Sequence, residues 1–259
     1  MNNTFFVTGS TGTVGKIVVN EIVNIGNPVY ILARDSFGNY LPDLIKKLEL
    51  IKITDSMITL IHCGWNTSKR DFVNQRQTFE MSCELLDFCA ASNIDFINFS
   101  SFSEKNFALS FYSQFKYLLS EKVLSKNGKN ILLGFVPVDN LLEKKIFSRS
   151  IFVEVSSSYS GLFIFPLVKP KVLELFLKDC IFQKQIASSE TRSLTVDFSL
   201  MGLNCSLMSL PLPKYLFPRI CKLVIHLLDL FNLRSNFIDR IASLIDTSEN
   251  ITDKFVSKY

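Results

Sequence analysis

Short apolar runs alternate with amphipathic segments over the first half of the chain, which is the pattern of parallel strands flanked by helices. An apolar run at residues 4–7 precedes a segment whose apolar positions recur at helical spacing as far as Gly26, and a second run follows at residues 29–32. Further strands are expected at 58–61, 94–99 and 131–136, with helices at 72–92 and 111–125. The sequence therefore predicts an α/β protein with a doubly wound parallel sheet.

The turn after the first strand carries three glycines, each three residues from the next. In such a turn the first glycine lets the chain leave the strand tightly, the second lets the backbone approach a pyrophosphate, and the third lets the helix pack on the sheet. The turn therefore predicts a dinucleotide site at the helix N-terminus, and a chance glycine cluster is the less favoured interpretation. The candidate phosphate contacts are Gly9, Ser10, Thr11, Gly12, Thr13, Val14 and Gly15.

Ligands of such sheets bind beyond the carboxyl ends of the strands, so the residues that follow each strand are expected to share one rim. Besides the glycine turn, these residues are Arg34, Cys63, Gly64, Trp65, Ser100, Ser101, Val136 and Pro137. Of these, Arg34, Cys63, Gly64 and Val136 are predicted to contact the cofactor. Together the segments predict a single cleft.

Tyr112 and Lys116 are four residues apart, and thus on one face of the helix that follows Ser101. The spacing alone is a weak signal, but its position beside the strand end favours a catalytic interpretation over a packed tyrosine with a solvated lysine. Hydride transfer at a carbinol carbon needs a group that takes or returns the hydroxyl proton. A free tyrosine titrates at about 10, and a neighbouring cation would lower that pKa.

Four segments together resemble the short-chain dehydrogenase/reductase superfamily, and in particular its extended and atypical branch, which contains the NAD-dependent epimerase/dehydratase family. The segments are residues 8–15, 60–64, 96–101 and 112–116. The resemblance implies a Rossmann-type sheet with a small C-terminal substrate-binding lobe. It also implies that Tyr112 is the general acid/base, and that Lys116 orients the nicotinamide ribose and lowers the tyrosine pKa. Ser101 would polarise the reacting oxygen, with Ser100 as the alternative.

The end of the second strand carries the cofactor preference in this family. An acid there binds the adenosine ribose, whereas an arginine accommodates a 2′-phosphate. Here Ala33 stands in the acid's place and Arg34 follows it, which predicts NADP. Asp35 keeps NAD open as the alternative, because a shift of one residue would bring its carboxylate to the ribose.

The chain also departs from the family pattern. Residues 35–57 must hold a third strand and the helices on both sides of it. Because a crossover with its helix normally takes at least about 10–12 residues, this region is expected to be trimmed, with one helix reduced to a turn. The segment between Ser101 and Tyr112 is also short for the sugar-modifying enzymes, which predicts a truncated loop beside the substrate.

Two parts of the chain are distinguished, residues 1–140 as the dinucleotide-binding domain and residues 141–259 as a segment that completes the sheet and forms a small substrate lobe. The second part is expected to contain a strand at 162–168, a helix at 171–182 and a long helix at 214–231. A polar stripe runs along that last helix, formed by Arg219, Lys222, His226 and Asp229. We expect it to pack on the protein's own core, and insertion into a membrane surface is less favoured because the stripe is not strongly basic.

Composition narrows the function classes. The net charge of +4 is small and spread along the chain, which gives no support to nucleic-acid binding. The six cysteines lack metal-ligand spacing and are interpreted as buried thiols in a reducing compartment, with no metal site. With no apolar run near 18 residues and no signal peptide, the chain is predicted to lack a membrane span and to be cytoplasmic.

The resemblance thus implies an NAD(P)-dependent oxidoreductase or epimerase that acts on a nucleotide-linked sugar or a related carbonyl compound. Since relatives dimerise through helices like those at 72–92 and 111–125, a homodimer is expected. The alternative is a non-catalytic NADP-binding protein with a regulatory or assembly role. The truncated loop beside the substrate is the feature that favours this alternative.

Overall fold

The structure is a computed structural model, and it describes residues 3–51, 57–101, 103–104, 109–133, 173–174, 176–178, 191–194, 216–230, 235–236, 238–239 and 242–243. Six parallel strands form one sheet in the order β2-β1-β3-β4-β5-β6. The strands are β1 (Asn3–Thr8), β2 (Val29–Ile31), β3 (Met57–His62), β4 (Asp95–Ser101), β5 (Lys129–Leu133) and β6 (Thr191–Leu194). The helices are α1 (Thr13–Asn24), α2 (Leu41–Leu50), α3 (Phe72–Ala91), α4 (Phe111–Ser125) and α8 (Leu216–Leu230). The predicted α/β class with a parallel sheet is confirmed.

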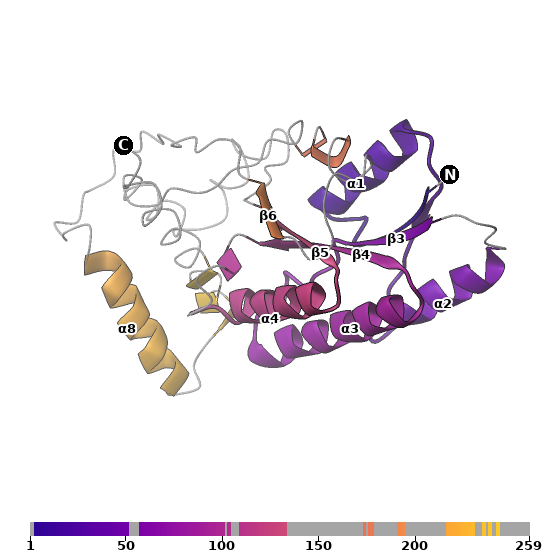
Figure 1. Ribbon diagram of the computed structural model, residues 1–259. Coiled ribbons are helices and arrows are strands. Elements are labelled where there is room, and N and C mark those ends of the chain that lie inside the picture. Colours follow the sequence, from indigo (N-terminus) through magenta and orange to yellow (C-terminus); the bar gives the residue numbers. More distant parts are fainter. Residues whose placement is uncertain are drawn as a thin grey trace.

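Helices cover both faces of the sheet (Figure 1): α1 lies on one face, and α2, α3 and α4 lie on the other. The alternation of side chains along a strand divides the core accordingly. In β1, Phe5 and Val7 join the cluster under α1, whereas Phe6 joins the cluster under the other three helices, and all three side chains are at most 1% exposed. A doubly covered strand explains why residues 5–7 of β1 are three consecutive apolar residues.

The region between β2 and β3 is simpler than the family pattern implies. It contains one helix, α2, and no strand among the described residues 32–51. As a result β3 pairs directly with β1, and β2 lies at the edge of the described sheet. The expectation of a third strand here was wrong for those residues, and of the two helices expected beside it they contain one, α2.

The second half of the chain adds a strand that the sequence did not predict. β6 pairs in parallel with β5, so residues 191–194 add a strand to the sheet. The long helix is confirmed as α8, and Ile225 on it packs with Leu109 and Ala242. Leu223, Leu227 and Leu230 of the same helix remain exposed. The strand expected at 162–168 and the rim residues Val136 and Pro137 lie outside the described residues.

Candidate functional site

The seven predicted phosphate contacts span the β1–α1 turn and the first residues of α1, and the turn opens with Gly9 at a φ of +65°. The Gly12 N–H donates to the Gly9 carbonyl at 3.0 Å, and α1 begins after Gly12. A Cβ at Gly9 would lie 2.7 Å from the Gly64 Cα, so the turn packs directly on the end of β3. The first N–H groups of a helix have no partner inside it, and here they face an exposed glycine turn. The turn can therefore hold a phosphate group.

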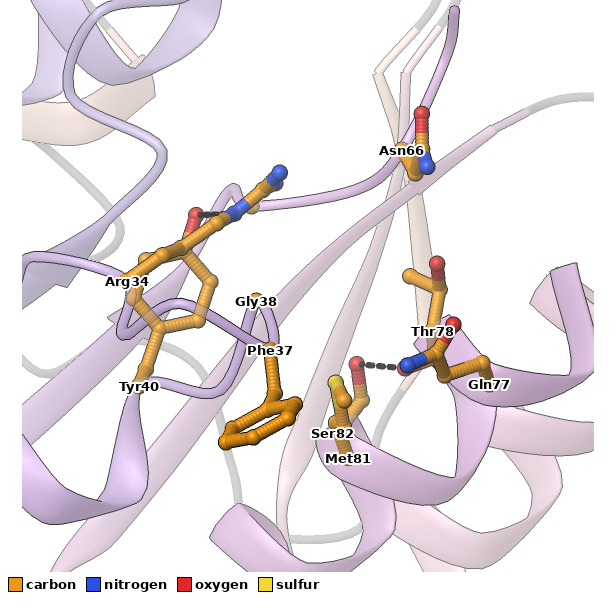
Figure 2. Close-up of a pocket in the computed structure, with 10 residues that line it drawn as sticks. Arg34, Phe37, Gly38, Tyr40, Asn66, Gln77, Thr78, Met81 and Ser82 are labelled. Carbon is orange, nitrogen blue, oxygen red and sulfur yellow. Dashed lines mark hydrogen bonds between the residues drawn. The ribbon is translucent and has the colours of Figure 1, made fainter. Parts of the chain in front are cut away.

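A pocket lies between the chain that follows β2 and the start of α3. Its lining residues are Arg34, Phe37, Gly38, Tyr40, Gly64, Asn66, Gln77, Thr78, Met81 and Ser82. Figure 2 shows Arg34 and Tyr40 on one side of this pocket and the α3 residues on the other. Arg34 Nε donates to the Tyr40 hydroxyl at 2.7 Å, and Tyr40 packs against Gly64. The pocket thus joins two predicted cofactor residues, Arg34 and Gly64.

Asp35, the residue that left NAD as the alternative cofactor, stabilises a turn. Its Oδ1 accepts hydrogen bonds from the backbone N–H groups of Phe37 at 2.9 Å and Asn39 at 2.8 Å. These bonds close the turn that carries Phe37 into the pocket. The Asp35 carboxylate is therefore oriented toward its own turn, while the Arg34 side chain lines the pocket.

The predicted catalytic residues meet at the same rim. Ser101 ends β4 and Tyr112 lies in the first turn of α4. The Ser101 hydroxyl lies 3.0 Å from the Ser103 hydroxyl, and it is also near enough to the phenol to lower the Tyr112 pKa as a hydrogen-bonding group. Ser100, the alternative for this role, instead donates to the buried Glu104 carboxylate. Burial raises the pKa of Tyr112, and the Arg70 charge and the Ser101 hydrogen bond act in the opposite direction. Of the two serines, Ser101 is the one placed to share a substrate oxygen with Tyr112.

Lys116 lies one helical turn after Tyr112, but the residue is only 4% exposed. Its Nζ donates to the Phe99 carbonyl at 2.9 Å and lies 4.5 Å from the centre of the Trp65 ring. Burial lowers the pKa of Lys116 to about 8, although the nearby Glu104 charge counteracts this. Trp65, in turn, meets the Tyr112 ring edge-on, with the two ring centres 6.4 Å apart. Trp65 therefore lies against both predicted catalytic side chains.

The sequence analysis did not identify Glu104, a buried acid near Ser100 and Lys116. Glu104 is 4% exposed and accepts hydrogen bonds from Ser100, from Ser120 at 2.8 Å and from Asn130 at 3.3 Å. Burial raises its pKa to about 7, since these neutral donors only partly offset the loss of water. No periodic pattern marks Glu104, because its three partners come from β4, α4 and β5.

The C-terminal segment reaches the same region. Asp239 is fully buried, and its carboxylate accepts from the Phe111 N–H at 2.7 Å and the Ser110 hydroxyl at 3.0 Å. Both donors belong to the start of α4, where a carboxylate is favourable to the helix dipole. Because Tyr112 is the next residue, Asp239 helps to fix the turn that carries it. A separation of 129 residues along the chain explains why no local pattern indicated this contact.

His62, the last residue of β3, is held by a directional hydrogen-bond chain. Thr8 Oγ1 accepts from the N–H groups of Cys63 at 3.1 Å and Gly64 at 3.0 Å, so its own hydrogen goes to His62 Nδ1 at 2.9 Å. The other ring nitrogen then donates to Ser82 Oγ at 3.1 Å. Burial lowers the pKa of His62 to about 3. The residue is thus a neutral structural histidine that aligns the ends of β1 and β3.

His62 and Glu104 contribute to stability with opposite pH dependence. The pKa of His62 falls from 6.5 to about 3 on folding, so its contribution is lost as pH falls below 6.5. The pKa of Glu104 rises from 4.5 to about 7, so its contribution is present below 4.5 and is lost as pH rises through 7. Between pH 4.5 and 6.5 the two contributions to the free energy of unfolding change with pH in opposite directions, and they cancel.

Glu104→Gln is therefore expected to leave the pH dependence of His62 without its opposing contribution. The free energy of unfolding of this variant should fall by about 1.4 kcal/mol for each pH unit from 6.5 to 4.5, whereas the parent protein changes much less. Urea denaturation at several pH values measures this. Glu80→Gln, at a carboxylate that is 52% exposed, is the control and should keep the parent profile. A flat profile for Glu104→Gln would contradict the assignment of these two groups.

Cysteine, metal and membrane expectations are tested within the described residues. Cys63, Cys83 and Cys89 are free thiols there, and burial raises the pKa of Cys63 to about 12. Among those residues no group of three or more histidine, cysteine or acidic side chains could hold a metal ion. The described helices also include none with the length and apolar character needed to cross a membrane.

Comparisons with known proteins agree with this architecture. No family model and no curated protein matches the sequence. Among solved structures, the chain is similar to the UDP-N-acetylglucosamine 4-epimerase from Bacillus cereus, at 17% identity and a TM-score of 0.51, with 74% of this chain and 78% of that one covered. It is also similar to a dTDP-4-dehydrorhamnose reductase from Clostridium acetobutylicum, at 12% identity and a TM-score of 0.55, covering 75% and 74% of the two chains.

A third structure, a short-chain dehydrogenase/reductase superfamily protein from Agrobacterium tumefaciens with bound NAD, has 18% identity and a TM-score of 0.54, with coverage of 77% and 81%. The glycine turn, the parallel sheet and these similarities together show that the chain has the extended short-chain dehydrogenase/reductase type of fold. The predicted fold is thereby confirmed.

Proposed function

We propose that the protein is an NADP(H)-dependent reductase or epimerase that acts on a nucleotide-linked sugar or a related carbonyl compound. The observation that carries the proposal is the placement of Ser101, at the end of β4, beside Tyr112, in the first turn of α4, at the sheet edge that also holds the glycine turn. An alcohol oxygen that met both hydroxyl groups would lie beside a nucleotide whose phosphates rest on that turn. The turn keeps the glycine-dependent shape that such a nucleotide needs, because a Cβ at Gly9 or Gly15 would collide with backbone.

In this mechanism the protein side chains transfer the substrate's hydroxyl proton and bind the oxygen that carried it. A bound nicotinamide ring would supply the hydride acceptor and donor. Tyr112 takes the hydroxyl proton as the carbonyl forms and returns it in the reverse direction. Ser101 donates a hydrogen bond to the same oxygen and so stabilises the charge that develops on it. Trp65, which is 8% exposed, limits the access of water to Tyr112.

The nucleotide-sugar class is supported by the solved structures of similar fold. Two of them are named for nucleotide sugars, the UDP-N-acetylglucosamine 4-epimerase and the dTDP-4-dehydrorhamnose reductase. A homodimer through α3 and α4 is part of the proposal. It is supported by Phe72, Val73 and Leu118 on those helices, which are 46%, 71% and 45% exposed.

The preference for NADP is supported by the pocket. Arg34 lines it and is held there by Tyr40, so a 2′-phosphate on the adenosine ribose would meet a positioned guanidinium. Arg34→Ala is expected to weaken NADPH binding about 10- to 100-fold, the usual range for a lost hydrogen bond to a charged group, and to change NADH binding little. Quenching of protein fluorescence or calorimetry measures both affinities.

Asp35→Asn is the matched control for that experiment. It removes a charge beside Arg34 but keeps an oxygen that can accept from Phe37 and Asn39. We expect it to leave the preference for NADPH in place. Tighter binding of NADH than of NADPH by the parent protein would reject the NADP assignment.

A second function, a non-catalytic NADP-binding protein, is favoured by one observation. The Lys116 ammonium is buried between the Phe99 carbonyl and the Trp65 ring, whereas the catalytic role requires it to reach a ribose. In that case the chain would bind the nucleotide without turning it over. Replacing Tyr112 distinguishes the two functions, because it should reduce turnover only if the protein is an enzyme.

A further inference from the structure

A cation from outside α4 packs on the Tyr112 ring. The guanidinium carbon of Arg70 lies 4.5 Å from the ring centre. Arg70 belongs to the segment between β3 and α3, and two contacts fix its position: its backbone N–H donates to Asn236 Oδ1 at 2.6 Å, and its Nε donates to the Thr67 carbonyl at 3.4 Å. The guanidinium group is thus held by its own loop, and the backbone of Arg70 by the C-terminal segment.

The other charged groups near Tyr112 are directed elsewhere. Lys116 donates to the Phe99 carbonyl and packs on Trp65. Glu104 accepts from Ser100 and Ser120. Asp239 accepts from the start of α4. Of these groups, Arg70 is the one whose charge lies over the face of the phenol.

This placement favours the ionised form of Tyr112. A cation over an aromatic face is attracted by the electron density of the ring. Loss of the phenolic proton adds a full negative charge, part of which is delocalised into the ring, so the attraction to Arg70 increases. Burial raises the pKa of Tyr112, and the Arg70 charge is the largest influence that lowers it, ahead of the Ser101 hydrogen bond.

We propose that Arg70 is the positioning residue that stabilises the Tyr112 phenolate, a task that the family pattern assigns to Lys116. The role of Arg70 in catalysis rests on the proposed function. Its effect on the pKa of Tyr112 is a property of the folded protein and can be measured without substrate. The proposal adds a contribution from the β3–α3 segment to the predicted set of Ser101, Tyr112 and Lys116.

Titration of Tyr112 in the full chain tests this proposal. Nuclear magnetic resonance of protein isotope-labelled at the tyrosine ring carbon that bears the oxygen follows each of the seven phenols, and the signal that Tyr112→Phe lacks identifies Tyr112. Arg70→Met removes the charge and keeps a long side chain. We expect its Tyr112 transition to move to higher pH, with a roughly tenfold or greater loss of phenolate at a pH below both transitions. Arg70→Lys should recover part of the shift.

Arg76→Met is the matched control, since Arg76 lies in α3, is 60% exposed and pairs with Glu80 at 2.8 Å. It removes the same charge and should leave the Tyr112 transition in place. An unchanged transition in folded Arg70→Met would overturn the proposal, as would a phenol that stays protonated in the parent protein over the whole pH range in which circular dichroism shows it folded. If Arg70→Met does not fold, equal transitions in Arg70→Gln and Arg70→Lys would overturn it. Turnover is measured separately, so failure of the proposed function is a distinct result.

Discussion

Tyr112→Phe is expected to reduce turnover by about 10²- to 10⁴-fold, the usual contribution of a general acid or base, while NADPH affinity stays nearly unchanged. The substitution removes only the phenolic oxygen. The ring that packs between Trp65 and Arg70 remains, so the fold and the rim should be preserved. The measurement is NADPH consumption with dTDP-4-dehydrorhamnose, and conversion of UDP-N-acetylglucosamine, alongside a binding titration with NADPH.

Tyr117→Phe provides the control for this prediction. It removes a hydroxyl from the same helix, α4, at a position five residues away and therefore on another side of the helix. It should retain full turnover. Parent-like turnover in Tyr112→Phe would show that the phenol is not the acid/base. Tight NADPH binding by a parent protein that converts neither compound would favour the non-catalytic function.

The parts of the fold that could be predicted are those determined locally. β1, α1 and β2 follow from two apolar runs, one helical periodicity and the glycine turn, all within about thirty residues, which is the span of a single strand–helix–strand unit. α3 and α4 follow in the same way from the sequence between Phe72 and Ser125. Ser101 could be placed in the same way, because it is the last residue of β4.

The third strand could not be predicted correctly, because it was expected from resemblance and not from a pattern in the residues. α2 has its own signals, with a proline in its first turn and an Asp43–Lys47 pair at 2.5 Å. A direct crossover from β2 through α2 to β3 satisfies the length of this segment. The small number of residues between β2 and β3 was therefore the feature of the sequence that indicated a single crossover helix.

The groups that sequence reasoning missed at the site share a physical cause. Arg70, Glu104 and Asp239 each act through contacts between elements that are far apart in the chain. A carboxylate such as Asp239 carries no periodicity, and its burial becomes visible only when the start of α4 is placed against it. The cation over the phenol was likewise not predictable from the Tyr112 and Lys116 spacing, which indicates a shared face but not the direction of either side chain.

The glycine turn leads to a prediction that separates stability from cofactor binding. In Gly15→Ala the new Cβ would collide with the Gly9 carbonyl group, with the carbonyl carbon at 2.7 Å, and would lie 2.8 Å from the Ser10 Cα. Because these atoms are backbone, they cannot rotate away. We expect Gly15→Ala to lower the free energy of unfolding by about 3 kcal/mol or more, the upper range for overpacking, and to abolish NADPH binding.

Gly12→Ala is the matched partner of Gly15→Ala. Its Cβ would meet nothing closer than the Gly9 carbonyl oxygen at 3.4 Å, which is ordinary contact, and the residue is exposed. The variant should therefore fold with nearly parent stability, yet it places a methyl group where the backbone must approach a pyrophosphate. We expect NADPH binding to be lost while the urea midpoint is kept. If Gly12→Ala bound NADPH as tightly as the parent, the phosphates would not rest on this turn, and the geometry that relates Tyr112 to the nicotinamide ring would no longer hold.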